Sequence, residues 1–230
     1  MVIGVVLAGL LLAPDFRVCI DPGHPSELND GFGVSNGLTE TAVNWKVSVL
    51  LKKQLERMGG FAITFTKSSE KQLVKNRERA EIANRFNADL FLRIHADAVP
   101  QSGFTIFYPK AQGKAQGKVG PSRQVIERSG RLAAAFHAAM AAELKGVLPD
   151  RGVKGDIESN IGSKQGALTG SIFSTVPVML VEMCSLTNKH DADWIRQPVN
   201  QQKMALALAK GCAAARDAAI SRATQRLGGR

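Results

Sequence analysis

Arg17-Val-Cys-Ile-Asp-Pro-Gly-His24 is the segment from which the architecture of this chain can be inferred. Its residues 18–20 form a short apolar run that is typical of a buried β-strand. Proline and glycine then end the strand and begin a loop. His24 therefore lies just beyond the carboxyl end of a strand, and in open α/β sheets ligands bind at that edge.

Two further segments repeat this pattern. The apolar run Leu90-Phe-Leu-Arg-Ile94 ends in His95, and Val178-Met-Leu-Val181 ends in Glu182. The carboxyl ends of parallel strands meet at one edge of a sheet. If the three strands are parallel neighbours, two imidazoles and a carboxylate converge there.

Strand-like and helix-like segments alternate along the 230 residues. Apolar periodicity predicts helices over residues 39–58, 71–86, 122–148 and from 199 onward. It predicts strands over 61–66 and 103–108, and the second of these is a candidate edge strand. Residues 110–121 and 151–175 are rich in glycine and polar side chains, and we expect loops there. The alternation indicates an α/β fold: a three-layer domain with a mostly parallel central sheet flanked by helices, formed by residues 14–227.

Residues 1–13 contain an apolar stretch that is too short to span a bilayer. Its length suits the hydrophobic region of a signal peptide, although a positively charged lead-in is missing. A buried first strand is the alternative. We expect an export signal or its remnant, a periplasmic or extracellular location, and no stable membrane span.

The net charge of +10 favours polyanionic partners such as nucleic acid, anionic lipid or an acidic cell-wall polymer, unless it serves only solubility. One tyrosine and two tryptophans offer few stacking surfaces, so we do not expect nucleic acid. Three cysteines form no even disulfide framework, and we expect them to be small buried apolar residues.

The strand-end residues include ligand types that suit zinc. The helix predicted after Thr39 places Glu40 at a helix N-terminus, facing back towards His24. A hydrolytic zinc site needs three protein ligands and one open position, which His24, Glu40 and His95 would supply. Glu182 remains as a carboxylate that can move a proton. The residues do not form a compact motif. The helix dipole favours a carboxylate in the first turn of a helix, which is an alternative reason for Glu40 to stand there. Spacing alone therefore does not decide whether these residues bind a metal.

Six short motifs, in this order along the chain, resemble those of the zinc-dependent N-acetylmuramoyl-L-alanine amidases of bacterial cell walls. The resemblance covers roughly residues 18–219. The motifs are Ile20-Asp-Pro-Gly-His24, Asn36-Gly-Leu-Thr-Glu40, Thr64-Phe-Thr-Lys67, Arg79-Ala-Glu-Ile-Ala-Asn84, Ile94-His-Ala-Asp97 and Val181-Glu-Met-Cys-Ser-Leu-Thr-Asn188.

The resemblance implies that His24, Glu40 and His95 bind one Zn²⁺ ion and that Glu182 is the catalytic glutamate. The implied reaction hydrolyses the amide between the lactyl group of N-acetylmuramic acid and L-alanine of the peptidoglycan stem peptide. Peptidoglycan is then the partner, and its anionic groups give the positive charge a purpose. Two alternatives stay open: an α/β zinc peptidase acting on a cell-wall peptide, and a catalytically idle peptidoglycan-binding module.

The chain departs from the usual family pattern at Arg93, where a serine is common. Strand alternation gives Arg93 the orientation of His95, so it would bind a substrate carboxylate or pair with Asp89 or Asp97. We expect Arg93 and Asp97 to contact substrate. The sequence predicts a monomer and leaves open whether a protein activator is needed.

Overall fold

The computed structural model describes residues 15–228, with side chains up to residue 221. The predicted export signal at residues 1–13 lies outside these described residues. None of the helices in the described part of the chain combines the length and the apolar character needed to cross a membrane.

A six-stranded sheet with the order β4-β1-β5-β10-β6-β9 forms the middle layer. Strands β4, β1, β5 and β10 are mutually parallel, β6 is antiparallel to β10, and β9 is parallel to β6. The three strands that carry the candidate site residues are therefore adjacent and parallel, as the sequence predicted. The strands of this sheet are β1 (Phe16–Pro22), β4 (Phe61–Phe65), β5 (Leu90–Asp97), β6 (Phe104–Tyr108), β9 (Asp150–Gly155) and β10 (Val178–Ser185).

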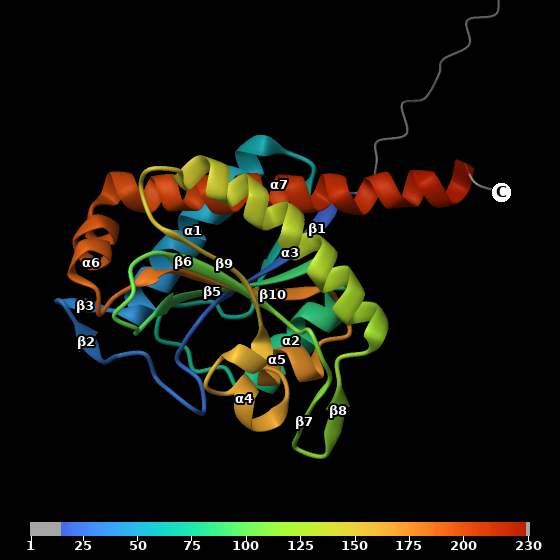
Figure 1. Ribbon diagram of the computed structural model, residues 1–230, viewed down its shortest axis with the longest axis horizontal. Coiled ribbons are helices and arrows are strands. Elements are labelled where there is room, and N and C mark those ends of the chain that lie inside the picture. The colour runs from blue at the N-terminus through green and yellow to red at the C-terminus, as the bar shows by residue number, and fades with distance from the viewer. Residues whose placement is uncertain (1–14, 229–230) are drawn as a thin grey trace, which may run out of the picture.

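Helices cover both faces of the sheet, so the predicted three-layer α/β fold is confirmed (Figure 1). Helices α1, α3 and α7 lie on one face, and α2, α4 and α5 lie on the other (Figure 1). The helices are α1 (Glu40–Met58), α2 (Asn76–Arg85), α3 (Arg123–Leu144), η1 (Asp156–Glu158), α4 (Gly162–Gln165), α5 (Thr169–Phe173), α6 (Lys189–Arg196) and α7 (Pro198–Gly228).

Alternation along β1 divides the core into two parts. Val18 and Ile20 belong to the larger cluster, with residues of α1, α3 and α7. Cys19 points the other way and packs with residues of α2 and α5. Burying these apolar side chains, at about 25 cal/mol per Å² of apolar surface, is the main force that holds the layers together. The three cysteines are buried and free, as predicted.

Register places the polar strand-end residues on the face that α2 and α5 cover. Asp21 and Arg93 follow Cys19 and Phe91 by two residues each, so they share the orientation of that core cluster. Two rows of register partners run across the sheet on this face: Asp21–Arg93–Leu180–Phe107–Lys154, and His95–Glu182–Thr105.

Three predictions about the second half of the sheet were wrong. Strand β6 is not an edge strand, because β9 pairs with it on the outer side. Residues 110–121 form a hairpin of β7 (Gly113–Ala115) and β8 (Lys118–Gly120) rather than a plain loop. Residues 151–175 contain most of β9 together with η1, α4 and α5. A smaller hairpin, β2 (Val34–Ser35) with β3 (Leu38–Thr39), precedes α1.

Candidate metal centre

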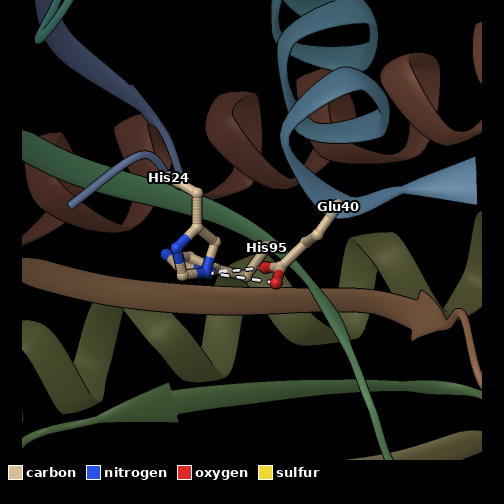
Figure 2. Close-up of side chains that lie close together, drawn as sticks. All are labelled: His24, Glu40 and His95. Carbon is tan, nitrogen blue, oxygen red and sulfur yellow. Dashed lines mark hydrogen bonds and ion pairs between the residues drawn. The ribbon is translucent and has the colours of Figure 1, made fainter. Parts of the chain in front are cut away.

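His24, Glu40 and His95 lie together at the carboxyl edge of the parallel strands (Figure 2). Nε2 of His24 is 3.1 Å from Oε2 of Glu40, and Nδ1 of His95 is 3.0 Å from Oε1 of the same carboxylate. One potential ligand atom from each residue lies within 4.8 Å of the others. The structure therefore brings together the three residues that the sequence singled out.

The loop after β1 holds His24 in one orientation. Its backbone is left-handed, with φ of 57°. Nδ1 lies 2.9 Å from the carbonyl oxygen of Asn29 and donates to it, and this bond orients the ring so that Nε2 faces the cluster. The Arg79 guanidinium donates to the carbonyl oxygens of Pro22 at 2.8 Å and Pro25 at 2.7 Å, on either side of the histidine. The His24 carbonyl itself accepts from Lys67 Nζ.

A buried ionic network anchors this loop to the sheet. Asp21 is fully buried and accepts from Thr66 and Arg79 on one oxygen and from Arg93 Nε, at 2.9 Å, on the other. Burial alone would raise the pKa of Asp21, but the positive charges of Arg79 and Arg93 hold it well below its usual range. Burial, and then the nearby Arg79 charge, lower the pKa of Lys67 to about 8.

Glu40 is the first residue of α1, and its carboxylate connects the two histidines. Oε1 also accepts from the Ala96 backbone N–H at 3.3 Å and from Asn44 Nδ2 at 3.2 Å. Burial opposes ionisation, yet hydrogen bonds from His24 and His95 hold the pKa of Glu40 well below its usual range. Glu40 is therefore a carboxylate in this site.

The His95 ring lies against the backbone of Gly23. A Cβ atom at residue 23 would come within 2.4 Å of ring carbon Cε1, closer than side-chain atoms approach one another. Glycine is therefore required here so that the ring can reach the carboxylate of Glu40. Burial lowers the pKa of His95 to about 4, so the imidazole is neutral near pH 7, as a metal ligand must be.

The donor set fits a divalent transition-metal ion. Nε2 of His95 and Oε2 of Glu182 are buried and have no hydrogen-bond partner among residues 15–221, which is costly unless another group satisfies them. Two imidazoles and one carboxylate form a ligand set that zinc accepts in hydrolytic sites.

Glu182 is the register partner of His95 on the neighbouring strand. Burial raises the pKa of this carboxyl group well above its usual range, and the negative charges of Glu40 and Asp97 add to the effect. A buried carboxyl group with a raised pKa, beside a cluster of potential metal ligands, is a candidate for proton transfer.

A cavity of about 800 Å³ opens in front of these residues. Its lining includes residues of the His24 loop, His95 and Glu182 at the strand ends, and residues of β9 and of the segment 158–161. A second hollow, of about 700 Å³, lies between the end of α3 and the start of β9. It contains none of the clustered histidines or carboxylates, so the first cavity is the candidate active site.

Comparison with known proteins identifies the family. A family model described as N-acetylmuramoyl-L-alanine amidase matches residues 18–214. The chain belongs to this amidase family. Its sequence is 30% identical over 197 residues to the N-acetylmuramoyl-L-alanine amidase LytC of Bacillus subtilis, an alignment that covers 84% of this chain and 34% of LytC. The chain thus spans about a third of the length of that relative.

Solved amidase structures share the fold. The apo form of Ami1 from Mycobacterium abscessus aligns with a TM-score of 0.71 and 23% identity, over 88% of this chain and 99% of Ami1. The CwlD amidase from Clostridioides difficile, solved in complex with the GerS lipoprotein, aligns with a TM-score of 0.69 and 19% identity, over 88% of this chain and 99% of CwlD.

Arg93 and Asp97 both line the cavity of this amidase domain, but Arg93 does not pair with Asp89 or Asp97. Its guanidinium binds Asp21, and its Nη2 donates to Asn76 at 2.7 Å, because Asp21 is its register partner on β1. Asp97 instead accepts from Arg151 at 2.9 Å. Contact of Arg93 and Asp97 with substrate stays a prediction.

Sequence reasoning missed the residues that support the amidase site. Asp21 stands within the Asp-Pro-Gly-His segment, and a charged residue at the end of a buried strand signals a buried partner. Arg79 lies in one of the six motifs, but nothing in its helical position indicated a role. The other two histidines of the chain, His137 and His190, lie elsewhere; His137 pairs with Asp150 at 2.9 Å.

Proposed function

We propose that this chain is a zinc-dependent N-acetylmuramoyl-L-alanine amidase that cleaves the bond between the lactyl group of N-acetylmuramic acid and L-alanine in peptidoglycan. The observation that carries the proposal is the His24–Glu40–His95 cluster with the unpartnered carboxyl group of Glu182 beside it. Family membership and the similarity to LytC support the choice of bond.

In the proposed mechanism, His24, Glu40 and His95 hold one zinc ion. When bound, zinc supplies a Lewis acid that polarises the carbonyl group and lowers the pKa of water. Glu182 takes a proton from the attacking water at its unpartnered Oε2 and gives it to the leaving nitrogen. The carbon–nitrogen bond breaks, leaving a lactyl carboxylate and the free amino group of L-alanine. The buried network around Asp21 keeps the His24 loop in place throughout.

Peptidoglycan as substrate implies action in the cell envelope, so we propose that the protein is exported. The net charge of +10 suits an anionic polymer. The complex of CwlD with a lipoprotein motivates the further proposal that a protein partner activates this chain.

The contact between Gly23 and His95 allows a test of the metal centre. We expect the purified chain to contain one zinc ion per molecule and Gly23→Ala to contain well under half of that, because the added methyl group displaces the His95 ring. Turnover on peptidoglycan falls in parallel. Elemental analysis after dialysis against trace zinc, combined with release of soluble fragments, measures both.

Gly33→Ala is the matched control. A Cβ atom at residue 33 meets no atom within 4 Å, so this variant keeps its zinc and its turnover. Full zinc content and full turnover in Gly23→Ala would contradict the placement of His95 as a ligand.

A further inference from the structure

Lys154, on β9, contributes an unneutralised positive charge to the active-site cavity. It lines the same cavity as Glu182, and within residues 15–221 its ammonium group has no ion pair or hydrogen bond. The acid closest in sequence on the cavity wall, Glu158, accepts from the Gly155 backbone N–H at 2.7 Å and lies 3.7 Å from Lys110 Nζ. Glu158 is therefore engaged by other groups, and the charge of Lys154 stays available.

Two buried hydrogen-bonding groups beside Glu182 also lack partners in the part of the chain that the structure describes. They are Nε of Arg151 and the hydroxyl oxygen of Thr105, and both residues line the cavity. Arg151 is fixed by the bond from its Nη2 to Asp97 at 2.9 Å, yet its Nε–H is unused. A buried donor without an acceptor is costly, and it is expected where a ligand supplies the acceptor. The β9 side of the cavity thus presents donors and a positive charge.

Sheet geometry sets the separation between this cation and the reacting bond. Lys154 shares a register row with Leu180, two strands away, and Glu182 follows Leu180 by two residues. Strands lie about 4.8 Å apart, so Lys154 is displaced roughly 10 Å sideways from β10. An extended peptide advances about 3.5 Å per residue. A stem peptide with its scissile amide at Glu182 brings its second residue within reach of the long Lys154 side chain.

Resting on the proposed amidase activity, we propose that Lys154, assisted by Arg151 Nε and the Thr105 hydroxyl, binds the free carboxylate of the second residue of the stem peptide. In peptidoglycan this residue carries either an α-carboxylate, as D-glutamate, or the corresponding amide, as D-isoglutamine. A carboxylate accepts charge-assisted hydrogen bonds from all three groups. The amide has no charge and turns an NH₂ group towards these donors. The site therefore selects the acid form.

The test compares two soluble disaccharide tetrapeptides that differ only in this group. For the unaltered full-length chain, kcat/KM is expected to be about tenfold higher for the D-glutamate form, the size typical of one charge-assisted hydrogen bond. In Lys154→Met the ratio between the two substrates falls several-fold, because the unneutralised charge is gone while Arg151 and Thr105 remain. Lys154→Arg keeps most of the preference. Lys114→Met, at an exposed position of the β7–β8 hairpin, keeps the full ratio while removing the same charge.

Each outcome has one meaning. A Lys154→Met enzyme with an unchanged ratio, or an unaltered enzyme that cleaves both substrates equally well, overturns the assignment of the carboxylate site while the amidase activity stands. If the unaltered, zinc-loaded enzyme cleaves neither substrate at the muramoyl–alanine bond, the proposed function itself is overturned, and the inference fails with it.

Discussion

Replacing Glu182 with glutamine is expected to lower kcat on peptidoglycan by about 10²–10⁴-fold, the range that a positioned proton-transfer group contributes. Glutamine has the same shape but cannot take a proton from the attacking water or pass it to the leaving nitrogen. Because His24, Glu40 and His95 are untouched, the zinc content stays at one ion per chain. Steady-state release of stem peptide and elemental analysis of the same sample measure the two effects.

Two further variants separate this effect from general damage. Glu81→Gln removes a carboxylate from the exposed face of α2 and keeps both turnover and zinc. His95→Ala loses both turnover and zinc, because a ligand is gone. Zinc-dependent hydrolysis at the normal rate in Glu182→Gln would contradict the catalytic role given to this residue.

Replacing Asp21 with asparagine is expected to lower the free energy of unfolding by about 3–5 kcal/mol, because Arg79 and Arg93 lose the buried negative charge that pairs with both of them. Zinc affinity falls as well, since Arg79 holds the carbonyl oxygens on both sides of His24. Urea unfolding monitored by circular dichroism, with a zinc titration of the folded protein, measures both changes.

The pH dependence of stability gives this prediction a second readout. The pKa of Asp21 is lowered in the folded chain, so its stabilising contribution is fully present above the unfolded value of about 3.9 and is lost as pH falls towards the lower folded value. Asp21→Asn removes this component of the acid-unfolding curve. Asp217→Asn, whose side chain is 65% exposed, is the control and changes stability by less than about 0.5 kcal/mol. Equal stability of the two variants would contradict the anchoring role of Asp21.

The convergence of His24, His95 and Glu182 could be predicted because it follows from parallel pairing alone. Each residue lies at or just beyond the end of an apolar run, and parallel strands bring such ends to one edge whatever helices connect them. The position of Glu40 at a helix N-terminus could also be predicted, because Thr39 is a typical N-cap residue and an apolar stripe follows it. The ligand cluster therefore depends on local signals that the sequence contains.

The partner of Arg93 could not be predicted, because alternation gives the direction of a side chain but not the neighbouring strand. Only the order β1-β5 makes Asp21 its partner in place of Asp89 or Asp97. Strand β9 was missed for a different reason. Its sequence Asp150-Arg-Gly-Val-Lys-Gly155 has two glycines and a single large apolar residue, which is typical of loops, and it forms a strand at the sheet edge by pairing with β6. Because β9 was not predicted, its two cationic residues that line the cavity, Arg151 and Lys154, were not predicted as site residues either.

Mass spectrometry of the soluble products released from peptidoglycan tests the proposed reaction most directly. We expect the full-length chain to release stem peptides whose first residue is L-alanine with a free amino group, with release stopped by a zinc chelator and restored by added zinc. A peptidase acting at the same site would instead release fragments cut within the stem peptide, with the muramoyl–alanine bond intact. Such fragments, or no released peptide from a zinc-loaded protein, would contradict the amidase assignment.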